Sequence, residues 1–519
     1  MDLFIKFAFL IVFFGIMIFV GFYCRKHATD VSGFVLGGRS VGPWLTAFAY
    51  GTSYFSAVVF VGYAGQFGWK FGIASTWVGI ANALLGSYLA WVVLGRRTRI
   101  MTQHLNANTM PKFFESRFDS RSLKIVASAI IFIFLIPYTA SLYNGLSRLF
   151  AMAFDIDYAV CVIIMAVLTG IYVIAGGYMA TAINDFIQGI IMLVGIVAVI
   201  AAVLKGQGGF MQALTKLAQV SDPAVSEAPG VFNSFFGPDP LGLLGVMILT
   251  SLGTWGLPQM VQKFYAIKSE KDINKGTIIS TLFAVVVAGG CYFLGGFGRL
   301  FSDVVDVNAN GFDSIIPTML ENLPTVLIAV VLVLVLSASM STLSSLVLAS
   351  SSTLTLDFLK DLRKKDMSEK QQLFTVRALI VVFIAISVVI AIVQYRSSVT
   401  FIAQLMGVCW GALAGAFLAP FLYGLYWKRT SSVACWVSFL FSAVVMLLNI
   451  FVRSAFPAVL QSPINAGAFC MLAGLVIVPV VSAFTPAPER SLVDSIFSCY
   501  DRKITVSVRD SIGDDAVDA

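Results

Sequence analysis

Hydroxyl side chains gather in two stretches of an otherwise apolar chain. One stretch is "AFAYGTSYFSAVVFVGYAG" at 47–65, and the other is "LSASMSTLSSLVLASSSTLTLDF" at 336–358. In a membrane helix such residues usually permit close packing or bond to nearby carbonyls. They also supply the neutral oxygen ligands that a hard cation accepts. The two stretches therefore support the hypothesis of a sodium site between two helices.

A sodium site of this kind also needs backbone carbonyls that are free from helical hydrogen bonds. Gly51 predicts a break in the first stretch, unwinding the chain from Gly51 to Ser56. A broken membrane helix exposes carbonyls where they line a cavity. Three carbonyls and two hydroxyls are the expected ligands: the carbonyls of Thr52, Phe55 and Ala338, and the hydroxyls of Ser341 and Thr342.

The composition places both stretches inside a membrane. Of 519 residues, 58% are hydrophobic and 12% are charged, and the mean hydropathy is +0.90. The apolar runs are continuous rather than alternating and are about 20 residues long, so they predict transmembrane helices and not barrel strands. We expect an all-α integral membrane protein with about thirteen spans: 3–24, 44–69, 73–95, 124–153, 157–175, 185–204, 239–262, 277–300, 324–357, 375–395, 399–426, 431–452 and 466–485.

The basic residues indicate the orientation of these spans. They concentrate in every second connector, and Lys263 and Lys268 belong to one such cluster. The positive-inside rule then predicts an amino terminus outside the cell and a cytoplasmic carboxyl terminus. The same clusters could bind anionic lipid, although orientation alone accounts for them. Nucleic-acid binding is not supported, and the polar tail after Phe484 is expected to be disordered.

Three segments, in order along most of the chain, carry a family resemblance. "FVLGGRSVGPWLTAFAYGTSYFSA", "YVIAGGYMATAINDFIQG" and "LSASMSTLSS" resemble signatures of the sodium/solute symporter family, which includes bacterial proline, pantothenate and sialic acid carriers and animal sodium-glucose carriers. The resemblance implies the leucine-transporter fold, in which two inverted five-helix repeats form the transport core. The implied divisions are a first span and connector at 1–43, a ten-helix core at 44–426 with repeats at about 44–204 and 239–426, two added helices at 427–485, and a cytoplasmic tail at 486–519.

The resemblance also assigns roles to residues along the ion path. The family's sodium ligands match the five residues already named. Asp185, in "INDFIQG", matches an acidic position near the inner sodium exit, although a carboxylate there could instead cap the following helix. Gly176 and Gly177 match a glycine signature and are expected to permit a tight turn or close packing.

Candidate solute-binding residues follow from the same resemblance. They are Tyr54, Ser56, Tyr138 and Trp255, with Gln66 as a weaker candidate. Ordinary packing or an interfacial position is the alternative for each aromatic residue. Proline carriers have an aspartate where this chain has Tyr54, and the segments "SYFSAVVFVG" and "GLPQMVQKFYAIKS" resemble the pantothenate-carrier branch more closely.

We therefore expect a multi-pass cell-membrane transporter. It would couple sodium entry to import of a small organic solute, such as pantothenate, an amino acid or a monocarboxylate, by alternating access. The implied partners are sodium, the solute and the lipid bilayer, and a monomer is expected to suffice for transport. Proton coupling is one alternative, and a transporter-derived solute sensor is another. An enzyme is not expected, because the spans hold almost no cluster of buried His, Asp, Glu or Cys.

Overall fold

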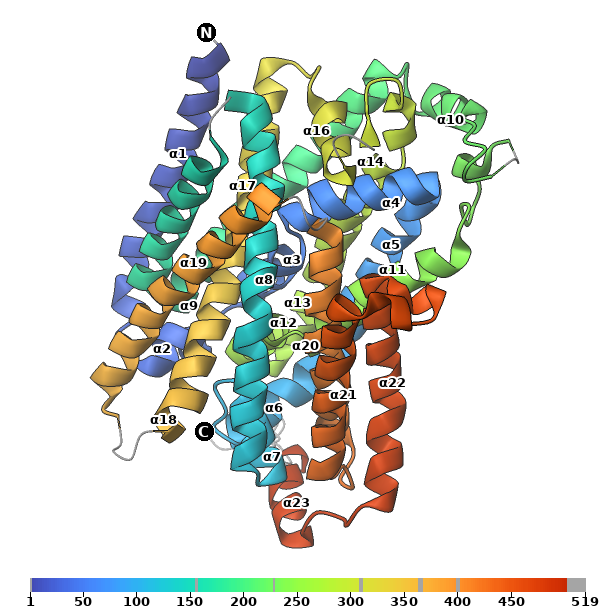
Figure 1. The fold of residues 1–519 in the computed structure, drawn as a ribbon. Helices are drawn as coiled ribbons and strands as arrows, with labels where there is room; N and C mark the ends of the chain where they lie inside the picture. Colours follow the sequence, from blue (N-terminus) through green and yellow to red (C-terminus); the bar gives the residue numbers. More distant parts are fainter. Residues whose placement is uncertain are drawn as a thin grey trace, which may run out of the picture.

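Long apolar helices make up most of the described chain, and many of them lie side by side in one bundle (Figure 1). The structure is a computed structural model that describes residues 2–154, 157–226, 229–307, 311–362, 367–397 and 402–501. Within these ranges there are isolated β-bridges but no strands, which confirms the all-α class. The basic residues Arg363, Lys364 and Lys365 and the last part of the predicted tail lie outside the described residues.

Ten described segments are long and apolar enough to cross a membrane, or eleven if one bent helix pair counts as a single span. Two of these segments are 47 and 49 residues long, whereas a membrane crossing needs about 20 residues. The longer one, α9 (Tyr158–Gly206), leaves helical geometry at Gly177, where φ is 55° and ψ is −145°. Gly177 therefore provides the turn that was expected there, and the count of thirteen spans stays a prediction.

The first repeat begins with a helix that is broken near its middle. Helix α3 (Pro43–Tyr54) ends before Phe55 and Ser56, and the chain continues as the π-helical segment η3 (Val58–Tyr63) and α4 (Ala64–Phe71). The predicted unwinding from Gly51 is therefore wrong in its starting point, since α3 stays helical through Gly51. A Cβ at Gly51 would lie 2.4 Å from the ring of Phe283, so this glycine permits close packing instead.

The rest of the chain before the second repeat, on both sides of this broken helix, forms shorter helices and the two long helices α8 and α9. Helix α8 packs against α17, α19 and α20, and the first helix of the chain packs against α9 and α17. The elements are α1 (Asp2–Tyr23), α2 (Val31–Leu36), α5 (Thr76–Ala81), η5 (Asn82–Leu89), η6 (Trp91–Gly95), α6 (Arg96–His104), α7 (Met110–Phe118), α8 (Arg121–Phe154), α9 and α10 (Phe210–Gln219).

The second repeat also begins with a broken helix. Helices α11 (Pro240–Gly256) and α12 (Pro258–Ala266) meet at Leu257 with a bend of 45°. The chain then forms α13 (Glu270–Ala284), η8 (Val285–Gly289), α14 (Gly290–Gly295), α16 (Ile315–Leu320), α17 (Thr325–Thr353), η11 (Leu354–Leu359), α18 (Lys360–Leu362), α19 (Glu369–Ser397) and α20 (Ile402–Tyr426). Helices α21 (Ser432–Phe451) and α22 (Pro463–Phe484) pack on α20.

The segment after Phe484 is partly ordered, contrary to the expectation of disorder. Residues Arg490–Phe497 form the helix α23, whose Val493, Ile496 and Phe497 are buried. The following Tyr500 hydroxyl donates to the carbonyl of Arg97 at 3.3 Å. The tail looked polar because its apolar residues lie one helical turn apart and form a single face that packs on α6.

Candidate functional site

Four of the five predicted sodium ligands converge where α17 packs on the end of α3. The hydroxyls of Ser341 and Thr342 each lie 3.2 Å from the Thr52 carbonyl. They also lie 3.2 Å and 3.1 Å, respectively, from the Ala338 carbonyl, so the one proton of each hydroxyl can be donated to either carbonyl. All four residues are fully buried. Oxygens of two helices that are far apart in sequence thus form one cluster.

The helix break explains why the Thr52 carbonyl is available. In a continuous helix this carbonyl would accept the N–H of Ser56, four residues on. Phe55 instead adopts an extended backbone with φ −83° and ψ 111°, while its own N–H still bonds to Gly51. Its carbonyl, the fifth predicted ligand, therefore leaves the helical hydrogen-bond ladder.

The spacing on α17 brings its three oxygens to one side of that helix. Residues three and four positions apart lie on the same face, so Ser341 and Thr342 lie above the Ala338 carbonyl. Hydroxyls have two lone pairs as well as one proton. When the two protons rotate away, both hydroxyl oxygens become ligands. Oxygens at about 2.3–2.6 Å from a cation and at right angles to each other are separated by about 3.3–3.7 Å, so the observed separations need little change to admit such an ion.

A polar chain leads away from this cluster to a buried ion pair. Ser53 and Ser345 bond through their hydroxyls at 2.8 Å, and Lys263 Nζ donates to Ser345 Oγ at 3.0 Å. Lys263 Nζ lies 3.8 Å from Asp185 Oδ2, and both side chains are at most 2% exposed. The buried pair therefore joins α9 to the half-helix α12 beside the oxygen cluster.

Lys263 was misassigned in the sequence analysis as a connector charge that indicates orientation. The structure places it inside α12, with Nζ 5.2 Å from the centre of the Tyr178 ring. The signal that could have identified it is its place five residues after Pro258, where Phe264, Tyr265 and Ala266 continue the apolar sequence beyond it. A charge buried in this way needs a partner, which Asp185 supplies.

Asp185 does not cap a helix, which was the alternative to an ion-path role. The turn in α9 falls at Gly177, two helical turns earlier, so Asp185 lies within the second half of the helix. Neither carboxylate oxygen has a hydrogen-bond partner in the described part of the chain. Buried polar groups are nearly always satisfied, so a water molecule fits this position, and the ion-path role of Asp185 stays a prediction.

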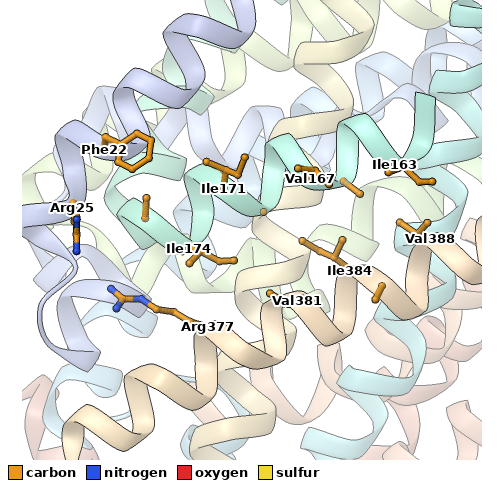
Figure 2. A pocket seen from close by; sticks show the side chains of 14 residues that line it. Phe22, Arg25, Ile163, Val167, Ile171, Ile174, Arg377, Val381, Ile384 and Val388 are labelled. Carbon is orange, nitrogen blue, oxygen red and sulfur yellow. The ribbon is translucent and has the colours of Figure 1, made fainter. Parts of the chain in front are cut away.

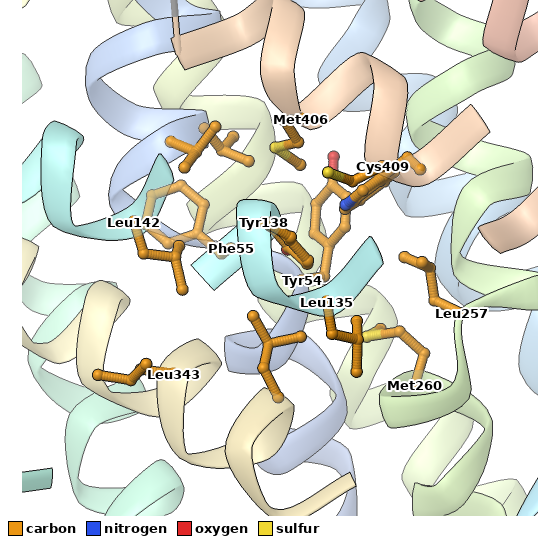
Figure 3. Packing of buried hydrophobic residues seen from close by; sticks show 14 of the residues in the cluster. Tyr54, Phe55, Leu135, Tyr138, Leu142, Leu257, Met260, Leu343, Met406 and Cys409 are labelled. Atoms are coloured by element: carbon orange, nitrogen blue, oxygen red, sulfur yellow. The ribbon is translucent and has the colours of Figure 1, made fainter. Parts of the chain in front are cut away.

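Two of the predicted solute-binding aromatics meet around a tryptophan that the sequence analysis missed. The ring centres of Tyr54 and Tyr138 lie 5.9 and 6.1 Å from that of Trp410. Figure 3 shows Tyr54 and Tyr138 among apolar side chains that include Leu257, Met260 and Cys409. Both tyrosine hydroxyls, the Trp410 indole nitrogen and the Ser56 hydroxyl are buried without a hydrogen-bond partner of normal geometry among the described residues. We call Tyr54, Tyr138 and Trp410 the aromatic cluster, and Ser56 lies in the break of α3, two residues after Tyr54.

The sequence contained only a weak indication that Trp410 belongs to this cluster, because the position of its indole depends on a contact with another helix. A Cβ at Gly253 of α11 would lie 2.6 Å from the Trp410 ring. The absence of a side chain at Gly253 therefore makes room for the indole of α20. A tryptophan followed by glycine and alanine residues in "CWGALAGAF" is the sequence feature that could have indicated a packed interior position.

The structure does not bring Trp255 or Gln66 to the aromatic cluster. Trp255 is half-buried, and its indole donates to the Leu85 carbonyl of η5 at 2.9 Å. Gln66 lines a separate cavity of about 940 Å³ together with Lys70, Asp239 and Arg299. Trp255 was a reasonable candidate because it precedes the break at Leu257, but its side chain is directed to η5 and not to Trp410.

Comparisons with known proteins show the family of the chain. The family model described as "Sodium:solute symporter family" matches residues 34–440. The chain is 31% identical over 446 residues to sodium/proline symporter 2 of Staphylococcus saprophyticus, covering 85% of this chain and 84% of that protein. It is 32% identical over 440 residues to the sodium/proline symporter of Staphylococcus aureus, covering 82% and 83%.

A solved structure gives the same result for the fold. A sodium-coupled sialic acid symporter in a substrate-bound outward-open state aligns with a TM-score of 0.73 and 18% identity, over 93% of this chain and 98% of that one. This likeness confirms the fold class that the sequence resemblance implied. Because the family model spans more than three quarters of the chain and both relatives exceed 30% identity, the chain belongs to the sodium:solute symporter family.

Proposed function

We propose that this protein imports a small carboxylate-bearing solute together with sodium by alternating access. The observation that carries the proposal is the convergence of Ser341 and Thr342 on the Thr52 carbonyl at the break of α3. Neutral oxygens in this number suit a monovalent hard cation that must bind and leave in every cycle. The orientation proposed with it has the amino terminus outside and the carboxyl terminus in the cytoplasm.

Sodium would act by holding α3 and α17 together. With sodium bound, the two hydroxyls of α17 and the freed carbonyl of α3 would all coordinate the same ion. The two helices would then be fixed relative to each other next to the aromatic cluster. This is how sodium would raise the affinity for solute, and solute must raise the affinity for sodium by the same factor. One charge that moves down a potential of 100 mV supplies about 2.3 kcal/mol, to which the sodium concentration gradient adds.

The aromatic cluster favours a solute with hydrogen-bond acceptors. Its polar groups are two phenols and one indole N–H, and all of them can donate. The cluster contains no carboxylate that would hold an amine, and Tyr54 occupies the position where proline carriers are expected to have an aspartate. A carboxylate on the solute, close to a bound sodium ion, would satisfy these donors. Pantothenate, a monocarboxylate and proline all carry one, and the names of the relatives make proline an essential test compound.

Uptake into proteoliposomes tests both parts of the proposal. Purified protein would be assayed with labelled pantothenate, proline, other amino acids and monocarboxylates, with and without an inward sodium gradient. We expect a carboxylate-bearing compound to accumulate only with the gradient. Sodium-independent uptake of every transported compound would exclude the coupling.

A pair of matched tryptophan variants tests the place of solute binding. Trp410→Phe removes a buried indole donor from the aromatic cluster, whereas Trp255→Phe removes one that bonds to Leu85 at the side of the bundle. We expect the first variant to raise the half-saturating solute concentration about tenfold, at about 1–1.5 kcal/mol for one lost hydrogen bond, and the second to leave it unchanged. Equal effects would place the solute elsewhere.

Proton coupling is a second candidate, favoured by the pair of Lys263 and Asp185 beside the oxygen cluster. Lys263 reaches Ser345 at 3.0 Å, so a change in its charge would be felt one helical turn from Ser341 and Thr342. Uptake driven by a pH gradient in the absence of sodium would support this candidate. Uptake that needs sodium and is unaffected by the pH gradient would exclude it.

A further inference from the structure

A lipid-facing groove lies between α1, α9 and α19, away from the site described above. Its volume is about 670 Å³, and its lining is apolar except for two arginines, Arg25 and Arg377. Figure 2 shows both arginines at one end of the groove and Ile163 and Val388 at the other end. The lining side chains Val167 and Val381 are each 55% exposed. The groove is therefore open to whatever surrounds the bundle.

The length of the groove corresponds to one leaflet of a bilayer. From Ile163 to Ala175 the helix α9 advances about 18 Å, at about 1.5 Å per residue. From Arg377 to Val388 the helix α19 advances about 16 Å by the same rise. The hydrocarbon core of a bilayer is about 30 Å thick, so half of it is about 15 Å. The apolar part thus matches the depth of an acyl chain, and the arginines lie where that chain's headgroup would be.

The two arginines are poorly supplied with acceptors from the protein. Neither forms an ion pair with a carboxylate in the described ranges. Arg377 donates from Nη2 to the Ala28 carbonyl at 3.1 Å, but its buried Nε has no partner among the described residues. Two neighbouring like charges with a spare donor favour an anionic ligand.

We propose that this groove binds one anionic glycerophospholipid, with an acyl chain along α9 and α19 and its phosphate between Arg25 and Arg377. Two basic groups beside an apolar channel between transmembrane helices are the features by which proteins select anionic headgroups. The bound lipid would connect α1 to α9 and α19, the three helices that line the groove. The proposal does not depend on which solute is transported.

A second groove provides an internal comparison. It lies between α1, α9 and α17 and has a volume of about 590 Å³. All the side chains that line it, among them Ala8 and Val333, are apolar. Lipid chains in contact with this groove meet no basic residue, so we expect no headgroup selection there. The difference between the two grooves is the pair of arginines, and the test follows from it.

Native mass spectrometry of the full-length protein in detergent measures the selection directly. The protein would be titrated with phosphatidylglycerol and with phosphatidylcholine of identical acyl chains. We expect the first lipid molecule that binds to each protein to be phosphatidylglycerol in preference to phosphatidylcholine. Arg25→Gln and Arg377→Gln should each reduce that preference about fivefold, the change that corresponds to about 1 kcal/mol for one basic group near anionic lipid.

Matched variants separate charge, folding and shape. Arg377→Lys keeps the charge and should keep most of the preference, while Arg490→Gln removes an exposed arginine outside the groove and should have no effect. Val167→Trp fills the groove and should reduce binding of both lipids, whereas Val194→Trp in the apolar groove should leave the phosphatidylglycerol preference intact. The Arg25 side chain makes no hydrogen bond to the residues that the structure describes, so Arg25→Gln stays informative if the Arg377 variants fail to fold.

Three outcomes would overturn the proposal. Equal binding of the two lipids by the unmodified protein would show that the groove does not select headgroups. A phosphatidylglycerol preference that survives in the Arg25→Gln, Arg377→Gln double variant would place the selective site elsewhere. Cross-linking of a photoreactive residue at position 167 in native membranes to a polypeptide rather than to lipid would show that a protein helix covers the groove.

Discussion

The two broken helices have nearly the same backbone and different surroundings. Phe55 ends α3 with φ −83° and ψ 111°, and Leu257 ends α11 with φ −74° and ψ 123°. In each case the N–H of the ending residue bonds to a glycine carbonyl four residues earlier at 3.1 Å, to Gly51 in one and to Gly253 in the other. The inverted repeats thus produce the same break twice.

The neighbouring helix decides what each break can do. The first break faces the hydroxyls of Ser341 and Thr342, which reach the carbonyl of Thr52. The second break faces the backbone of α20, where a Cβ at Gly256 would lie 2.8 Å from the Leu418 nitrogen. A break supplies free carbonyls, but a cation needs the additional ligands that a second helix provides. The first break is therefore the candidate ion site, and the second is a packing contact.

The largest expected effect comes from the ion pair that joins α12, the helix after the second break, to α9. Asp185→Asn leaves Lys263 of α12 buried without a counter-charge, which costs about 3–5 kcal/mol. We expect a large loss of thermal stability and of folded yield in detergent. The Asp185→Asn, Lys263→Gln double variant should recover most of that stability, because both charges are removed together. A double variant as unstable as the single one would show that the pair does not explain the effect.

Removing both hydroxyls at the first break should have the next largest effect. The Ser341→Ala, Thr342→Ala variant loses two ligands at about 1.5 kcal/mol each, which is on the order of a hundredfold in sodium affinity. The sodium dependence of uptake measures it. Ser339→Ala is the control, since that hydroxyl donates to the Val335 carbonyl within its own helix. An unchanged sodium dependence would remove the two hydroxyls from the proposed site.

A larger side chain at the second break should lower the stability of the protein and leave its sodium affinity unchanged. Gly256→Ala adds a Cβ that would lie 2.9 Å from Ala414 Cα and 2.8 Å from Leu418 N, so we expect a loss of about 1–3 kcal/mol from overpacking. Thermal unfolding measures the loss. Gly15→Ala on α1, where a Cβ meets nothing within 4 Å, should be neutral. A lowered sodium affinity in Gly256→Ala would contradict the separation of roles between the breaks.

The smallest effect concerns an ion pair that connects the outer ends of the two broken helices. Lys70 Nζ of α4 lies 2.7 Å from Asp239 Oδ2, and Asp239 Oδ1 accepts the Gly242 N–H at the start of α11. Partial burial raises the pKa of Asp239, but the hydrogen bonds from Lys70 and Gly242 outweigh it and hold the pKa below its usual range.

The lowered pKa of Asp239 predicts a specific dependence on pH. Its contribution to stability is complete above the ordinary aspartate pKa of about 4, and it is lost as the pH falls through the lowered folded-state value. Because both side chains are well exposed, we expect at most about 1 kcal/mol. Asp239→Asn keeps a capping side chain and should flatten the stability profile between pH 5 and 3, as followed by thermal unfolding. Asp239→Ala should lose the cap as well, at about 1 kcal/mol more. An equally steep profile in Asp239→Asn would assign the acid sensitivity to other carboxylates.

Local properties of the chain were sufficient to predict much of the fold. Hydropathy indicated the spans, because a bilayer-crossing helix must be apolar over its whole length. Gly177 indicated a turn, because a glycine acts on its own backbone. The starting point of the first break was wrong, since Gly51 is accommodated by the ring of Phe283 on another helix.

By itself, the sequence determined an all-α membrane protein of this family, with hydroxyl-rich helices and a helix break. The meeting of Ser341 with Thr52, the burial of Lys263 against Asp185, and the presence of Trp410 rather than Trp255 beside Tyr54 were decided by the tertiary structure. The physical reason is that composition and propensity act within a helix. Which side chains converge depends on the rotation of each helix and on the glycines that allow another helix to approach.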